Sequence, residues 1–198
     1  MKDKDDRGGI EMKTILVFIN GRAGVGKDTF VDFCRDYAEE THQCRVYNIH
    51  RSDAPKVALQ ALGWSGEKNE SARSLLKHMV DFMEENGLLN RYLEEQISVA
   101  RSINTNDVII FYHVRDPEIM YSLLDQYSRN YEDVIPLSLL IKRDTASSEP
   151  EEWWGDLEKG DYMVTIELPN HLDGSMQAAK GFVDFLLDEE WEVKRNYE

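Results

Sequence analysis

The sequence predicts a three-layer α/β fold, in which one parallel five-stranded sheet lies between two layers of helices. One observation is that apolar runs of strand length alternate along the chain with segments whose apolar residues recur at helical spacing. The other is that the first run, residues 14–20 (TILVFIN), is continuously apolar, which is typical of a strand buried on both faces of a parallel sheet. We therefore expect right-handed crossover connections between the strands and a single domain over residues 12–198.

The other elements follow in chain order. After the first strand, four more strands are expected, at residues 45–50, 108–114, 135–142 and 162–168. Helical periodicity covers residues 29–40, 54–104 with breaks at 63–66 and near 86–87, and 176–187. Asp116 followed by Pro117 predicts an N-cap and the first residue of another helix. Residues 1–11 alternate in charge without an apolar period, and we expect a disordered leader there.

Composition limits the classes of function. The net charge of −15 over 198 residues argues against a protein that binds nucleic acid through its phosphate backbone. No apolar run is long enough for a membrane span and no signal peptide is visible, so a cytoplasmic protein is expected. Cys34 and Cys44 are expected to be free thiols, with Cys34 on a buried helical face. The five histidines are scattered without metal-ligand spacing, so no structural metal is expected.

The segment from Gly21 to Thr29, GRAGVGKDT, carries the most specific signal in the chain. It follows a predicted buried strand and opens a helix, which is the context of a P-loop. Glycines let the backbone N–H groups point at phosphate oxygens, and the helix N-terminus adds partial positive charge at the same place. Lys27 would reach the β- and γ-phosphates. These residues therefore predict an ATP site, formed by Gly21, Gly24, Val25, Gly26, Lys27, Asp28 and Thr29.

Asp28 stands where a P-loop usually has serine or threonine, and Thr29 follows it. A hydroxyl at that position helps to hold Mg²⁺, and a carboxylate can also ligate Mg²⁺ directly or through water. The alternative is that Asp28 is a capping carboxylate in the first turn of the helix. Asp28 and Thr29 are accordingly candidate Mg²⁺ ligands.

Several motifs together resemble one family. The GKDT of the P-loop, Asp53-Ala-Pro-Lys56, Val114-Arg115-Asp116-Pro117-Glu118 and the closing stretch from Asp161 to Gly174 are similar to segments of phage and bacterial deoxynucleoside monophosphate kinases. The matches extend from residue 14 to about residue 187 in the same order. The resemblance implies a P-loop NTPase fold of nucleotide kinase type, with an acceptor-side helical insertion at about 54–104 and a lid at about 143–160.

The resemblance also implies roles for individual residues. Lys27 and the loop amides would hold ATP, Arg115 would stabilise charge on the migrating phosphoryl group, and Arg143 would contribute from the lid. Asp53 and Lys56 would lie toward the acceptor. Two features depart from the family: His113 replaces an acid that helps to hold Mg²⁺, and the lid after Arg143 is acidic. His113 is interpreted either as a local base or as a core histidine.

The acceptor-side insertion offers three further candidates. Trp64 would stack on a base, and Lys68 or Arg73 would bind its phosphate. The alternative is a tryptophan that fills an inter-helix gap beside solvated cations. We therefore expect an ATP- and Mg²⁺-dependent kinase of a nucleoside or deoxynucleoside monophosphate. The alternatives are a P-loop kinase of a non-nucleotide metabolite and a nucleotide-binding protein that binds a partner without catalysis.

Overall fold

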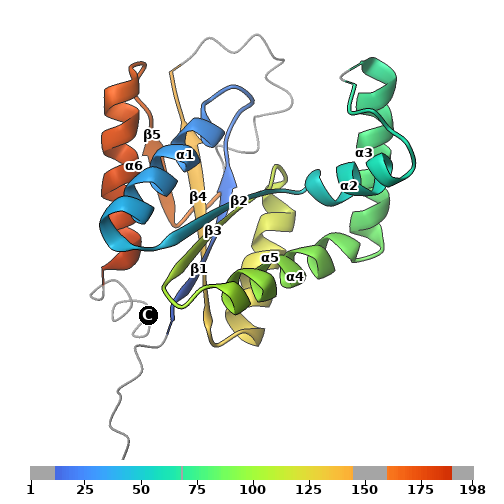
Figure 1. Cartoon of the computed structure of the whole chain (residues 1–198). Coiled ribbons are helices and arrows are strands. Elements are labelled where there is room, and N and C mark those ends of the chain that lie inside the picture. Colours follow the sequence, from blue (N-terminus) through green and yellow to red (C-terminus); the bar gives the residue numbers. More distant parts are fainter. Residues whose placement is uncertain (1–11, 68, 145–159, 189–198) are drawn as a thin grey trace, which may run out of the picture.

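A parallel sheet organises the molecule (Figure 1). The computed structural model describes residues 12–67, 69–144 and 160–188. The leader 1–11, Lys68 and residues 145–159 of the expected lid lie outside these described residues. The strands run in the order β2-β3-β1-β4-β5, and every neighbouring pair is parallel. They are β1 (Thr14–Asn20), β2 (Arg45–His50), β3 (Val108–His113), β4 (Val134–Lys142) and β5 (Val164–Glu167).

Helices connect the strands. They are α1 (Lys27–Tyr37), followed by a π-helical turn (Ala38–His42), α2 (Asp53–Ala61), α3 (Glu70–Glu85), α4 (Leu88–Ile103), α5 (Pro117–Asn130) and α6 (Leu172–Leu187). The α/β three-layer fold predicted from the sequence is confirmed, as is the expected count of five parallel strands. Of the described helices, none combines the length and apolar character that a membrane span requires.

The central strand β1 separates two hydrophobic cores, because alternate side chains of a strand point to opposite faces. Ile15, Val17 and Ile19 pack on one face with residues of α1 and α6. Leu16 and Phe18 pack on the other face with residues of α4 and α5. Figure 1 shows α1 and α6 on one side of the sheet and α4 and α5 on the other. All seven residues of β1 are buried, as the continuous apolar run predicted.

The topology creates a crevice at the carboxyl edge of the sheet. The connection after β1 leads into α1 on one face, whereas the connection after the neighbouring strand β3 leads into α5 on the opposite face. Two adjacent parallel strands whose connections leave in opposite directions form the usual ligand-binding position of an open α/β sheet. The residues that follow Asn20 and His113 therefore face the same crevice.

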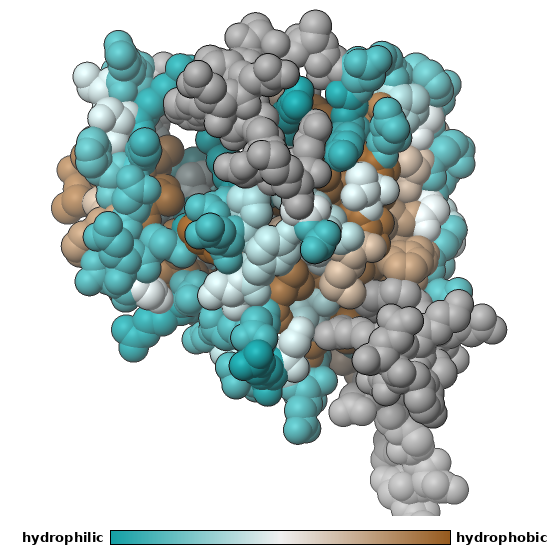
Figure 2. Space-filling view, turned by 180° about the vertical axis from the view of Figure 1, so that it is seen from behind, coloured by the Kyte–Doolittle hydropathy of each residue, from teal (hydrophilic) through white to brown (hydrophobic). Residues whose placement is uncertain are grey.

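Within residues 54–104, where an insertion was expected, α2 and α3 form an arm that projects from the body of the molecule, whereas α4 packs against the sheet (Figure 1). No residue of α3 is buried. Leu75 is 47% exposed and Phe82 55% exposed, and Figure 2 shows apolar side chains gathered on this side of the molecule. The ion pair between Arg51, just after β2, and Glu84 of α3 ties the arm to the sheet.

Some element boundaries differ from the sequence prediction. β5 covers only Val164–Glu167 rather than 162–168, because it is the edge strand and pairs only with β4. The helix expected from residue 29 begins at Lys27, directly after the left-handed N-cap Gly26. Asp116 caps α5, since its side chain accepts the N–H of Glu118 and Pro117 follows, as predicted.

Candidate nucleotide-binding site

The loop between β1 and α1 has the backbone geometry of an anion cradle. Gly21, Gly24 and Gly26 all have positive φ, of 144°, 73° and 97°. Gly26 is also the N-cap of α1, and no side chain caps the first turn of this helix. The N–H groups of that turn thus lack a side-chain acceptor, and they lie at the positive end of the helix dipole. Such an arrangement is ready to bind a phosphate.

Close packing also requires glycine at the start of the loop. A Cβ atom built on Gly21 would lie 2.5 Å from the carbonyl oxygen of Ile141, a backbone atom of β4. A Cβ atom on Gly24 would meet no atom within 4 Å, so only the backbone conformation calls for glycine there. Val25 is buried beside Gly21 and anchors the loop to the core.

Lys27 lies over this loop. Its Nζ donates hydrogen bonds to the carbonyl oxygens of Gly21, at 2.6 Å, and Arg22, at 2.9 Å. Burial, together with the nearby positive charge of Arg115, lowers the pKa of Lys27 to about 8, against the opposing effect of Asp28. The site is thus locally cationic although the chain as a whole carries a net charge of −15.

Arg143 approaches the loop from the end of β4. Its guanidinium lies against Gly26, since a Cβ on that glycine would be 3.4 Å from both terminal nitrogens of Arg143. One of these nitrogens, Nη2, donates to Oγ of the buried Ser175 in α6 at 3.0 Å. Nε is buried and has no hydrogen-bond partner in the described part of the chain. Arg143 is therefore at the predicted site, and a residue that the sequence did not single out holds it there.

Arg115 follows β3 across the crevice. Asn20, at the end of β1, donates from Nδ2 to the carbonyl oxygen of Arg115 at 3.2 Å and accepts the N–H of Gly21 at 2.7 Å. This buried asparagine fixes the start of the loop relative to Arg115. The Arg115 side chain is exposed, and no carboxylate of the described residues pairs with it. Asn20 was not predicted, because its role depends on which strand lies beside β1.

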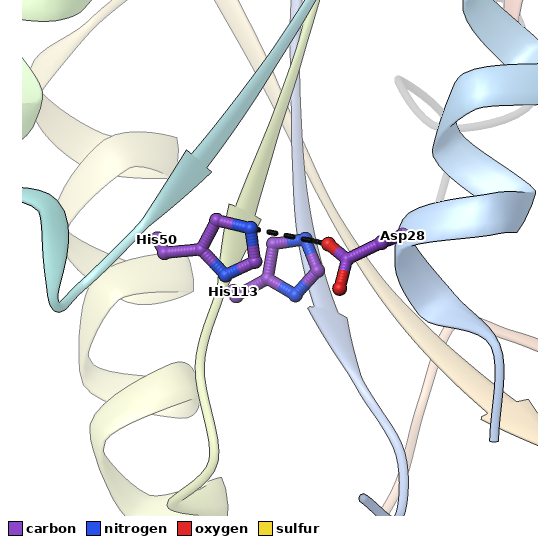
Figure 3. A group of neighbouring side chains, drawn as sticks. All are labelled: Asp28, His50 and His113. Carbon is purple, nitrogen blue, oxygen red and sulfur yellow. Dashed lines mark ion pairs between the residues drawn. The ribbon is translucent and has the colours of Figure 1, made fainter. Parts of the chain in front are cut away.

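Asp28 points from the first turn of α1 toward the ends of β2 and β3 (Figure 3). Its Oδ1 lies 3.1 Å from Nε2 of His50 and accepts from Nδ2 of Asn48 at 3.2 Å. Within the described residues, no backbone N–H donates to this carboxylate, so its contacts are not those of a helix cap. Thr29, the other predicted Mg²⁺ ligand, is exposed beside it.

His113 lies at the end of β3, directly opposite His50 in the register of β2 with β3. The two imidazole rings stack at 4.0 Å with an interplanar angle of 20°. Burial and the neighbouring His50 lower the pKa of His113 to about 3, so this imidazole is neutral at pH 7. Its Nε2 is 2.6 Å from Oδ1 of Asn48, as expected for a donated proton.

The histidines are thus not scattered in space as the sequence suggested. Asp28, His50 and His113 offer ligand atoms that lie within 4.8 Å of one another, a group that could hold a metal ion. The expectation of no metal site rested on sequence spacing alone, which does not show that His50 and His113 lie side by side in the fold. His50 ends the predicted strand 45–50 and His113 is the next-to-last residue of the predicted strand 108–114. This was the available signal, but the strand order was needed to bring the two histidines together.

The predicted acceptor residues lie in two places. Asp53 begins α2 near the histidines, where its Oδ2 accepts the N–H of His50 at 2.7 Å and its Oδ1 pairs with Lys56 at 2.9 Å. Trp64 lies between α2 and α3, half-buried, with its Nε1 buried and unpartnered among the described residues. Arg73 is exposed on α3. The structure therefore brings Asp53 and Lys56 to the crevice and leaves Trp64 and Arg73 on the arm.

Comparisons with known proteins give only matches of low similarity, all to solved structures. No protein-family model matches the chain, and a search of curated proteins gives no match. Thymidylate kinase from Ehrlichia chaffeensis is similar with a TM-score of 0.45 at 15% identity, covering 89% of this chain and 100% of that chain. A de novo designed P-loop fold protein matches with a TM-score of 0.39 at 15% identity, covering 89% and 95%. FlhF, complexed with GMPPNP and Mg²⁺, matches with a TM-score of 0.35 at 13% identity. This match covers 88% of this chain and 62% of the FlhF chain.

The fold class follows from the molecule itself. A parallel three-layer α/β sheet carries Gly-x4-Gly-Lys between its central strand and the following helix, and the loop has the open, positive-φ backbone of a phosphate cradle. The chain has a P-loop NTPase fold.

Proposed function

We propose that this chain is an ATP-dependent phosphotransferase whose acceptor is a nucleoside or deoxynucleoside monophosphate. The observation that carries the proposal is the convergence of three cationic side chains on one glycine-rich loop. Lys27 lies over the loop, Arg143 lies against Gly26, and Arg115 is close enough to perturb the pKa of Lys27. Three cations and a helix N-terminus match the charge of a nucleotide triphosphate.

The geometry suits phosphoryl transfer because the protein catalyses this reaction by positioning the reactants and stabilising charge, and forms few covalent bonds itself. The loop amides and Lys27 would hold the β- and γ-phosphates, and Arg115 would stabilise charge that spreads over the γ-phosphoryl oxygens. Arg143 would bind the phosphates from the side of α6, where its hydrogen bond to Ser175 limits its movement. These groups act by position and charge, which is the main source of rate in this class of reaction.

Oxygen ligands for Mg²⁺ are available next to the loop. Asp28 is 67% exposed, and only its Oδ1 contacts other described residues. Its other oxygen and the hydroxyl of Thr29 would hold Mg²⁺, which supplies charge neutralisation between the β- and γ-phosphates when bound. The donor set therefore fits a hard cation at the edge of the loop.

The acceptor would enter from the side of α2. Asp53 and Lys56 lie at the start of this helix, and Asp53 accepts the backbone N–H of His50 at the end of β2. Trp64 and Arg73 lie on the arm and would contact the acceptor from there, and a role for Lys68, outside the described residues, stays a prediction. We assign the nucleotide acceptor from the resemblance to deoxynucleoside monophosphate kinases rather than from shape.

The test is ADP formation from ATP and Mg²⁺, with each of a panel of ribo- and deoxynucleoside monophosphates. We expect one monophosphate to stimulate ADP formation. Arg115→Ala should lower turnover at least tenfold with near-normal ATP affinity, whereas the matched control Arg129→Ala, an exposed pair with Asp125 on α5, should behave like the wild type.

Two results would redirect the assignment. Stimulation only by a non-nucleotide phosphate acceptor would make this a metabolite kinase of the same fold. ATP binding without acceptor-stimulated turnover would indicate a nucleotide-binding protein that acts through a partner.

A further inference from the structure

Three side chains meet at the carboxyl ends of β2 and β3, next to the P-loop (Figure 3). His50 and His113 end these two strands, and the parallel register places them directly opposite each other and therefore on the same face of the sheet. Asp28 reaches them from the first turn of α1. The three residues come from three separate segments, so the cluster exists only in the folded chain.

The distances within the cluster match those between ligands of one metal ion. Oδ1 of Asp28 is 3.1 Å from Nε2 of His50 and 3.7 Å from Nε2 of His113. In a tetrahedral site with bonds of about 2.0–2.1 Å, neighbouring ligand atoms lie roughly 3.3 Å apart. All three ligand atoms lie within 4.8 Å of one another, and the two imidazole rings, now stacked at an interplanar angle of 20°, would rotate so that both nitrogens point at a common centre.

The surroundings also suit a metal. His113 is only 9% exposed, and its ring is held at the end of β3 by the hydrogen bond with Asn48. Asn48 contacts two members of the cluster, through Oδ1 to His113 and Nδ2 to Asp28. Ligation through Nε2 would require the tautomer of His113 that carries its proton on Nδ1, so the hydrogen bond to Oδ1 of Asn48 would be given up, whereas Nδ2 of Asn48 would still orient the Asp28 carboxylate, as outer-shell groups do in metal sites.

We propose that Asp28, His50 and His113 form a binding site for a transition-metal ion of the Zn²⁺ class. Two imidazoles and one carboxylate favour a borderline ion over Mg²⁺ or Ca²⁺, which prefer oxygen ligands throughout. Three protein ligands leave a fourth position open to water or to an oxygen of a bound molecule. The site shares the Asp28 carboxylate with the proposed Mg²⁺ position but uses its Oδ1 rather than its other oxygen, and its existence does not depend on whether the chain binds ATP.

The test uses Co²⁺ as a spectroscopic probe of the full-length, metal-free protein. We expect one equivalent of Co²⁺ to produce visible absorption typical of tetrahedral coordination, Zn²⁺ to abolish it, and a large excess of Mg²⁺ to leave it unchanged. His50→Gln and His113→Gln should each weaken Co²⁺ binding at least tenfold. The control His78→Gln, on the exposed surface of α3, should bind as the wild type does.

His50→Gln decides the outcome if His113→Gln fails to fold, because His50 is only half-buried and its backbone N–H keeps the bond to Asp53. Circular dichroism and ATP binding, measured on the same samples, separate loss of the metal site from loss of the fold or of the P-loop. The proposal is overturned if the wild type gives no tetrahedral Co²⁺ spectrum, or if folded His50→Gln binds Co²⁺ as tightly as His78→Gln does.

Discussion

Replacing single glycines of the loop separates the effect of packing from that of backbone conformation. At Gly24, alanine meets no atom within 4 Å, so its only cost is the left-handed φ of 73°. This cost is about 1–2 kcal/mol for a residue with a Cβ. At Gly21, alanine meets a strained positive φ of 144°, and its Cβ also lies 2.5 Å from the Ile141 carbonyl oxygen.

The second contact makes Gly21→Ala the more severe change. Ordinary close C···O contacts are about 3.3 Å, so β4 or the loop must move by roughly 0.8 Å. Such overpacking costs about 1–3 kcal/mol, and a strained positive φ adds about 1–3 kcal/mol. We expect Gly21→Ala to lower the free energy of unfolding by about 2–6 kcal/mol, and Gly24→Ala by about 1–2 kcal/mol.

Thermal and urea unfolding followed by circular dichroism would measure both effects. For a chain of this size, about 1 kcal/mol corresponds to a Tm change of about 2–4 °C. Gly181→Ala in α6 is the control, because this glycine has no positive φ and no atom within 4 Å of the added Cβ. It should raise stability by about 0.5–1 kcal/mol. Equal losses at Gly21 and Gly24, or no loss at Gly24, would refute the loop geometry described above.

Three further predictions concern other parts of the molecule. Asp116→Ala removes the cap of α5 and should cost about 1 kcal/mol of stability in urea unfolding, whereas an unchanged midpoint would contradict the capping bond. Arg51→Ala removes the partner of Glu84, and because the Arg51 side chain is only 14% exposed the loss should be about 1–3 kcal/mol, with faster amide exchange in α3 but not in α6. Burial raises the pKa of Cys44 to about 12 and that of Cys34 further still, so both stay protonated at pH 8. Neither should react with a thiol reagent in the native protein, and both should react in denaturant; rapid native labelling would contradict the burial.

Sequence pattern was sufficient where local chemistry decides structure. The run of residues 14–20 predicted β1 to the residue, because burial on both faces leaves every position apolar. Asp116-Pro117 predicted the start of α5, since capping is a local interaction. The length of the edge strand β5 was overestimated. Its residues are alternately exposed, so its ends are less clearly marked in the sequence than those of a buried apolar strand.

The site was predictable only in part. The loop glycines and Lys27 lie within one short segment, so the sequence alone predicts their function. Asn20 acts through Arg115 and Gly21, and Ser175 acts through Arg143 from a helix 32 residues further along the chain. Such roles depend on strand order and helix packing, which no short-range sequence pattern predicts.

Binding of ATP at the loop is the central claim. Calorimetric titration with ATP and Mg²⁺ tests it most directly, on the wild type, on Lys27→Ala and on the control Lys180→Ala, whose ammonium lies over the ring of Tyr37 near the end of α1 that is remote from the loop. We predict one site in the wild type and in the control, and affinity at least tenfold weaker in Lys27→Ala. Unchanged affinity in folded Lys27→Ala, or no binding to the folded wild type, would contradict the account.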